Sequence, residues 1–199
     1  GPYPAGGEYY LTGTYVALDM AWEWYYDSAA GRIYLWAPGE DDPDNHVVEV
    51  KARDNAFDLR GRSYVTVEGF DIFASTVVTD DDSHHITLDG LDAAYVDHFT
   101  LLGSDHGAWA TDDSGVILDG HHNVLKNSHI QYSAGNGVSL IGDDSTITDC
   151  TIHDVNYVGV YCGTVNTGKG RTKNNVITRN TLYNSGRDVL QHTAAQYAT

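Results

Sequence analysis

Short apolar runs alternate with polar turns along most of the chain, and helical periodicity is almost absent. The runs are three to five residues long, are rich in β-branched side chains, and are bounded by Gly, Asn, Asp and Ser. Such runs are typical of short β-strands that end in turns. The pattern therefore predicts an all-β protein made of many short strands.

A repeat of about 22 residues organises the second half of the chain. A gapless alignment of its units brings into register Leu118, Leu140 and Cys162. Each unit continues into a second short run, with apolar residues five positions apart in the pairs Leu125/Ile130, Ile147/Ile152 and Ile177/Leu182. Two earlier units follow this plan less regularly, with the pairs Val65/Phe70 and Ile86/Leu91.

A unit of this length cannot close a hydrophobic core alone, whereas stacked units bury their inward side chains on one another about 4.8 Å apart. We therefore expect a right-handed parallel β-helix of about five coils over residues 56–199. A β-sandwich or a propeller would have longer strands and hairpin turns about 8 to 12 residues apart. Residues 56–199 lack both features.

Residues 1–55 have a different pattern. Two aromatic runs, Trp22–Tyr26 and Arg32–Trp36, flank the turn segment Asp27–Gly31, which predicts a β-hairpin. Seven of the 14 Tyr and three of the four Trp lie before residue 37. We expect these rings to pack the hairpin and its following loop against the solenoid, with stacking on sugar rings as the alternative.

The chain is strongly acidic, with 11 Lys and Arg against 28 Asp and Glu and a net charge of −17 at pH 7. Such a surface repels phosphate, so nucleic acid is not expected as a partner. The longest apolar runs are far shorter than the ~20 residues of a membrane-spanning helix, so no membrane span is expected. Residues 163–199 nevertheless carry +4 and the remainder −21, which indicates either chance clustering on solvated turns or an anion-attracting patch at one end.

Five segments resemble the right-handed parallel β-helix repeat proteins of large exported bacterial polysaccharide-processing systems: Glu23–Pro38, Ala56–Phe70, Ser133–Val138, Ile152–Tyr157 and Asn184–His192. The resemblance implies that the partner is a polysaccharide, held in a groove along one parallel sheet. It also implies an extracellular or cell-surface location, although the first residues lack the basic and apolar regions of a signal peptide. Because such proteins have further coils, we expect a fragment whose open terminal coil favours end-to-end self-association.

Alternation along the strands is expected to turn one column of side chains outward, namely Ile117, Ser139, Tyr161 and Gln191. The turn before these strands stacks Asn136, Tyr157, Arg187 and Asp188 on successive coils. By resemblance to glycan-active β-helices, a sugar chain would lie here, against the substrate-binding candidates Asn136, Tyr157, Tyr161 and Gln191. Arg187 is then the candidate for binding a carboxylate or sulfate and Asp188 for proton transfer, with a simple surface ion pair as the alternative.

A long insertion, residues 94–114, leads directly into this proposed groove. Long loops on a rigid scaffold commonly carry function. Trp109 is the candidate for stacking on a sugar ring, although packing under its own loop is an equal alternative. His106, Asp112 and Asp113 are the candidates for acid/base chemistry. Hydrolysis needs two carboxyl groups roughly 5 to 10 Å apart, and the predicted pair is Asp188 with Asp112 or Asp113.

A second turn column is expected to stack Asp, His and Asn on successive coils, in the segments Asp82–His84, His121–Asn123, Asp143–Ser145 and Lys173–Asn175. Calcium is the less favoured alternative to solvated turns, because the sequence has no compact loop of alternating acidic residues. Zinc is disfavoured, because neighbours in the pairs His84–His85 and His121–His122 are expected to point in opposite directions. The sequence therefore predicts no metal or other cofactor.

The two cysteines are expected on different walls of one coil, with both thiols free and a disulfide between them as the alternative. Cys150 is expected in the turn column of Ser128 and Asn180, while Cys162 and His192 are expected inside the solenoid.

These observations favour a carbohydrate-active domain, either a glycoside hydrolase or a polysaccharide lyase. A lyase would need Arg or calcium to neutralise a uronate, together with a base near C5. The sequence contains no catalytic motif of high specificity, so a non-catalytic glycan-binding, adhesin-like or filament-forming β-helix is the alternative.

Overall fold

The computed structural model describes residues 14–97, 114–133, 135–155, 164–167 and 172–185. The chain divides into two compact units, residues 1–50 and 51–199. The boundary lies five residues before the predicted one, because the segment that precedes the first solenoid strand already bonds to the next coil. The backbone amide of Thr76 donates to the carbonyl of Asp54 at 2.9 Å.

The first unit contains the predicted hairpin. Its strands, β1 (Trp24–Asp27) and β2 (Arg32–Leu35), pair antiparallel, and three 3₁₀ turns accompany them, η1 (Tyr15–Ala17), η2 (Pro38–Glu40) and η3 (Pro43–Asn45). The hairpin turn closes on the carboxylate of Asp27, which accepts the backbone amides of Ala29 and Ala30 at 3.0 Å. The prediction of a hairpin at this position is therefore confirmed.

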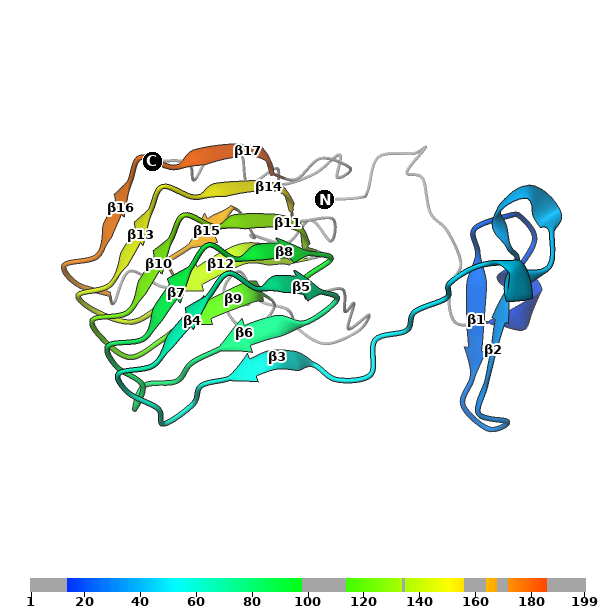
Figure 1. Cartoon of the computed structure of the whole chain (residues 1–199), viewed down its shortest axis with the longest axis horizontal. Coiled ribbons are helices and arrows are strands. Elements are labelled where there is room, and N and C mark those ends of the chain that lie inside the picture. The colour runs from blue at the N-terminus through cyan, green and yellow to red at the C-terminus, as the bar shows by residue number, and fades with distance from the viewer. Residues whose placement is uncertain (1–13, 98–113, 134, 156–163, 168–171, 186–199) are drawn as a thin grey trace, which may run out of the picture. The chain divides into compact units, whose positions relative to one another are not determined.

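The second unit is a stack of coils that forms three parallel sheets (Figure 1). The first sheet contains β3 (Asn55–Asp58), β6 (Thr76–Val78), β9 (Ser114–Leu118), β12 (Asn136–Leu140) and β15 (Val165–Asn166). The second contains β4 (Thr66–Glu68), β7 (Thr87–Asp89), β10 (Val124–Lys126), β13 (Thr146–Thr148) and β16 (Val176–Thr178). The third contains β5 (Asp71–Phe73), β8 (Asp92–Ala94), β11 (His129–Ser133), β14 (Thr151–Val155) and β17 (Thr181–Ser185).

Each coil visits the three sheets in the same order, so the described strands make five coils of a parallel β-helix. The interior is filled by columns of aliphatic side chains, such as Leu125, Ile147 and Ile177 on successive coils of the second sheet. Leu125 and Ile147 are fully buried, and burial of each such side chain stabilises the fold by about 1.5–3 kcal/mol. The predicted all-β parallel β-helix, its five coils and its 22-residue repeat are confirmed.

The predicted register of the first two coils is wrong by two residues. Val67 and Leu88, rather than Val65 and Ile86, lie in the column of Leu125. Ile86 instead lies at the corner, where its backbone amide donates to the side-chain oxygen of Asn123. Because this corner position is apolar in the early coils and polar in the later ones, a hydrophobic pattern alone fits both registers.

The last coil also differs from the prediction. Val165 pairs with Val138, and Asn166 pairs with Ser139. The predicted alignment, which places Tyr161 beside Ser139, is therefore shifted by five residues, because this coil has five additional residues before β15. Tyr161, Cys162 and His192 lie outside the described residues.

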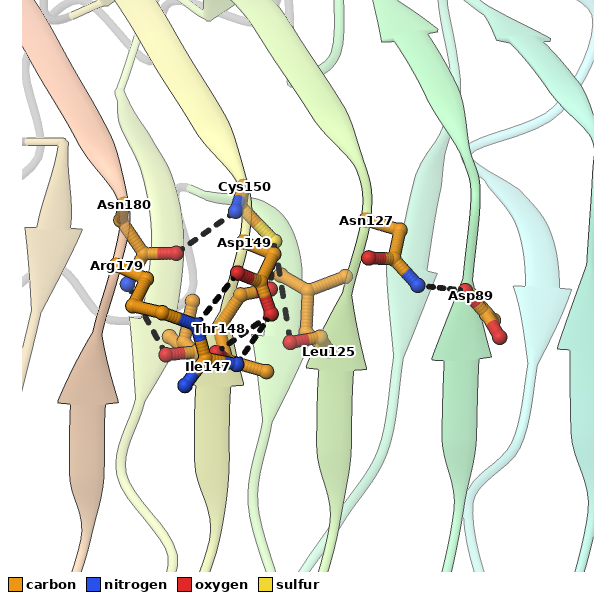
Figure 2. Close-up of polar contacts among 9 residues, drawn as sticks. All are labelled: Asp89, Leu125, Asn127, Ile147, Thr148, Asp149, Cys150, Arg179 and Asn180. Atoms are coloured by element: carbon orange, nitrogen blue, oxygen red, sulfur yellow. Dashed lines mark hydrogen bonds and ion pairs between the residues drawn. The ribbon is translucent and has the colours of Figure 1, made fainter.

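The corner between the second and third sheets is held by polar side chains that stack from coil to coil (Figure 2). The side-chain oxygen of Asn180 accepts the backbone amide of Cys150, and its nitrogen donates to the carbonyl of Ile147. Cys150 is a buried free cysteine, and burial raises the pKa of its thiol. Its predicted column with Ser128 and Asn180 is confirmed, because these residues occupy the same corner position on successive coils.

Each corner also contains a column of residues with positive φ. At the corner between the first and second sheets these are Tyr64, His85, His122, Asp144 and Asn174, with φ between 52° and 58°. At the end of the third sheet they are Ala74, Tyr95, Tyr132, Asp154 and Asn184, the last three within β11, β14 and β17. A left-handed residue interrupts the strand alternation, so two successive side chains can lie on the same side of the chain.

Candidate functional site

Nine of the ten predicted site residues lie outside the described residues, so their roles stay predictions. They are His106, Trp109, Asp112, Asp113, Tyr157, Tyr161, Arg187, Asp188 and Gln191. Asn136 is described, and it is fully buried in β12. Its side-chain amide donates to Ser114 Oγ at 3.0 Å, and Ser114 Oγ lies 2.7 Å from Ser139 Oγ. Asn136 thus lies in a buried polar cluster with Ser114 and Ser139, and its contact with a substrate stays a prediction.

The third sheet instead carries a column of rings, which we call the aromatic ladder: Phe73, Tyr95, Tyr132, His153 and Tyr183. One ring comes from each coil, and the centroids of consecutive rings lie 5.4, 4.9, 6.3 and 4.5 Å apart. Phe73, Tyr95 and Tyr183 are 60%, 42% and 44% exposed. Exposed aromatic side chains that line up in a row form a contiguous apolar surface, and such surfaces often mark binding sites. The ladder is therefore a candidate binding surface.

A chain of acidic and imidazole groups, the Asp–His network, crosses the ladder in its middle coils. It consists of Asp92, His129, His153 and Asp154. A carboxylate oxygen of Asp92 lies 3.4 Å from His129 Nδ1, the two Nε2 atoms of His129 and His153 are 2.7 Å apart, and His153 Nδ1 lies 2.6 Å from Asp154 Oδ2. The network therefore connects a buried carboxylate to an exposed one through two rings.

The network restricts where protons can be. An ionised Asp154 can only accept, so His153 Nδ1 carries a proton and donates it to the carboxylate. One proton also lies between the two Nε2 atoms, because two imidazole nitrogens at hydrogen-bonding distance need a donor and an acceptor. The ring of His129 then presents Nδ1 to Asp92, on the exposed side.

The parallel register explains how this network forms. Asp92 and His129 are direct partners on β8 and β11, and His153 and Tyr183 are direct partners on β14 and β17. Asp154 follows His153 with φ 50°, which keeps both side chains on the outer side. Asn184, one coil away, donates to the other carboxylate oxygen of Asp154 at 3.1 Å.

Sequence reasoning missed both groupings, although part of the signal was present. The predicted pairing of Ile130 with Ile152 already implies that His129 and His153 lie on adjacent coils. The positive φ at Tyr132 and Asp154 was not predicted, and it decides which side chains join the ladder.

Two other groups bear on metal binding. Among the described residues, Asp80, Asp81 and Asp82 bring their carboxylates together, but Asp80 already accepts the backbone amide of Gly61 and the hydroxyl of Ser83. These hydrogen bonds lower the pKa of Asp80.

The expectation that neighbouring histidines point in opposite directions is wrong. The Nδ1 atoms of His84 and His85 lie 3.1 Å apart, and those of His121 and His122 lie 2.9 Å apart. The physical reason is the positive φ of His85 and His122, which returns the second ring to the side of the first. The first segment of the expected turn column is displaced by two residues, since His84 pairs with His121. The alignment of the other three segments is confirmed, since His121 pairs with Asp143 and the register of β13 with β16 places Asp143 level with Lys173.

Comparisons with known proteins support the architecture. A family described as "Right handed beta helix region" matches residues 114–197, which agrees with the parallel sheets and with the predicted right-handed coil. None of the curated proteins and none of the solved structures matches the chain. Within the described part of the chain, no helix is long and apolar enough to cross a membrane.

Proposed function

We propose that the protein binds a polysaccharide along the aromatic ladder and that the Asp–His network transfers protons to or from the bound sugar. The single observation that carries the proposal is that the ladder and the network share His153. A row of rings gives a repeating apolar surface against which a sugar chain can pack, and the network gives a proton-transfer group beside it. From the first coil to the fifth, the platform is about 19 Å long.

In this proposal each network residue has one task. Asn184 holds Asp154, Asp154 holds His153, and His153 holds His129. His129 Nδ1 with Asp92 faces the substrate. As a base, His129 would take the C5 proton of a uronate while the C4–O glycosidic bond breaks, and water would protonate the departing oxygen, which is lyase chemistry. Hydrolysis would need a second carboxyl group, and Asp71 is the direct neighbour of Asp92 on the adjacent coil.

A non-catalytic glycan-binding role is the second candidate. It is favoured by the burial of His153 and Asp154, which are each 7% exposed. Buried and fully bonded groups of this kind also serve to hold a surface in shape.

Binding is tested by titrating the protein with a panel of neutral and uronate-containing plant and algal polysaccharides in affinity electrophoresis and calorimetry. Phe73→Ala and Tyr183→Ala should each weaken binding about two- to tenfold, because each removes one stacking ring. Tyr64→Ala is the matched control, since Tyr64 is 74% exposed but lies outside the ladder. Equal affinities for all variants, or no binding to the panel, would overturn the proposal.

Catalysis is tested on the same polysaccharides by following new reducing ends for hydrolysis and unsaturated products for elimination. His129→Gln and Asp92→Asn should lower turnover about 100-fold or more while binding persists. Binding without turnover in the unchanged protein would reject the catalytic role and leave the binding role.

A further inference from the structure

The turns that join β6 to β7 and β9 to β10 lie side by side at the corner between the first and second sheets (Figure 1). These turns contain a block of four imidazole rings. We call it the histidine tetrad: His84, His85, His121 and His122. Within each coil the two rings are nearly perpendicular, with their Nδ1 atoms 3.1 and 2.9 Å apart. Between coils, His84 stacks on His121 and His85 on His122, each at 5.0 Å and within 4° of parallel.

This arrangement suits the binding of a metal ion better than the binding of a sugar, which is the role proposed for the aromatic ladder. Two nitrogens about 3 Å apart, each at ~2.0–2.1 Å from one ion, subtend an angle of roughly 90–100°. A tetrahedral zinc ion would need a separation of about 3.3 Å, whereas cis positions of a square-planar or tetragonal ion need the shorter one. Such geometry is preferred by Cu(II) and Ni(II), and imidazole is a suitable ligand for both.

We propose that each pair of the histidine tetrad binds one Cu(II) or Ni(II) ion through its two Nδ1 atoms, so that two ions lie about 5 Å apart. One ion cannot take all four nitrogens at ~2.0 Å, because the stacked rings are a full coil apart. Water completes the coordination, and on binding the Nε2 atoms carry the imidazole protons.

The surroundings of the tetrad favour a cation. Tyr64 stacks on His85 at 4.7 Å and closes one end of the block. On the other side the columns continue into Asp143 and Asp144, whose carboxylates accept from Lys173 and Asn174 of the following coil. Their negative charge adds to the attraction for a cation.

The test is a titration of the full chain with Cu(II) or Ni(II) salts, followed by calorimetry and, for copper, by electron paramagnetic resonance. We expect two bound ions of tetragonal geometry, with nitrogen coupling at one equivalent and dipolar broadening between two coppers at two equivalents. The double variant His84→Ala/His121→Ala removes one ligand from each pair and should weaken binding at least tenfold.

Two controls identify the site. His46→Ala removes an exposed histidine that is bonded to Asp41 in the first unit, and His129→Gln alters the Asp–His network. Both should keep the affinity and the dipolar signal. Unchanged binding in the tetrad variant, or a spectrum without nitrogen coupling, would show that the rings only stack and would overturn the proposal. Because the polysaccharide assays do not involve these rings, the two proposals can fail independently.

Discussion

The Asp–His network and the histidine tetrad use the same side chain in two different ways. In the network, the two rings come from strands of the third sheet, meet through Nε2, and end on carboxylates. In the tetrad, the rings come from corner turns, meet through Nδ1, and have no carboxylate bonded to them within the described residues.

The difference teaches what a parallel solenoid does with histidine. On a strand, the neighbours one coil away are fixed by the register, so a carboxylate can be placed beside each ring and hold one tautomer. At a corner, a left-handed residue brings two consecutive rings together, so that the Nδ1 atom of each ring contacts the Nδ1 atom of the other. The first arrangement suits proton transfer, and the second suits a metal ion.

The largest expected effect comes from Gly120→Ala, which should separate the two coils of the tetrad without removing a histidine. Gly120 has φ +85°, and a Cβ there would overlap the backbone oxygens of Ser83 and Asp80 on the preceding coil. The overlap and the strained φ together should lower the free energy of unfolding by about 3–5 kcal/mol. Chemical denaturation measures this, and copper coupling between the two pairs should disappear.

Gly61→Ala is the matched control for that substitution. Gly61 has φ +63°, but a Cβ there would meet nothing within 4 Å. Its cost should be limited to about 1–2 kcal/mol of backbone strain. If both glycine variants lose the same stability, the close approach of coils at the tetrad corner is not what requires Gly120.

The next largest effect is a difference in the free energy of unfolding between a variant of the Asp–His network and a variant of the histidine tetrad. His153→Ala leaves the buried carboxylate of Asp154 without its imidazole, which should cost about 2–4 kcal/mol. His121→Ala removes an exposed ring and should change stability by no more than about 0.5 kcal/mol. Denaturant titration of both variants checks the difference. The double variant His153→Ala/Asp154→Ala should recover part of the loss, and equal costs for the two single variants would contradict the proposed contrast.

The smallest expected effect is the loss of an exposed ion pair that belongs to neither histidine cluster. Arg179 bonds both carboxylate oxygens of Asp149 on the neighbouring coil, at 2.7 and 2.6 Å (Figure 2), and this lowers the pKa of Asp149. Because the folded state holds the proton less tightly, the pair stabilises above the ordinary Asp pKa of ~3.9 and is lost as the pH falls through the lowered value. Asp149→Asn should therefore lower the melting temperature slightly at pH 7 and not at all in strong acid. Asp58→Asn is the control within one coil, since Arg60 lowers the pKa of Asp58 to about 2. A loss that persists in strong acid would contradict this account.

Most of the architecture could be predicted, because the interior of a parallel β-helix repeats. The spacing of Leu125/Ile130 and Ile147/Ile152 is enough to align the later coils, and the structure keeps that alignment. The early coils were misaligned because Val65 and Ile86 occupy corner positions that are polar in later coils. The spacing of apolar residues along the chain does not distinguish an apolar residue at a corner from one in the core.

The candidate sites could be predicted only in part. Asn136 was expected to contact substrate because it lies in a turn, but Ser114 and Ser139 enclose it in a buried polar cluster. Arg187 and Asp188, in the basic segment, and Asp112, in the long insertion, lie outside the described residues. Their catalytic roles therefore stay predictions. The ladder and both histidine clusters were missed because their members come from different coils.

The sequence by itself determined the repeat, the all-β class and the aliphatic columns, since these follow from the order of apolar residues along the chain. Only the tertiary structure decided that His129 and His153 lie within hydrogen-bonding distance and that His84, His85, His121 and His122 form one block. The physical reason is that these contacts depend on the register between coils and on left-handed corner residues. Neither is encoded in local hydrophobic periodicity.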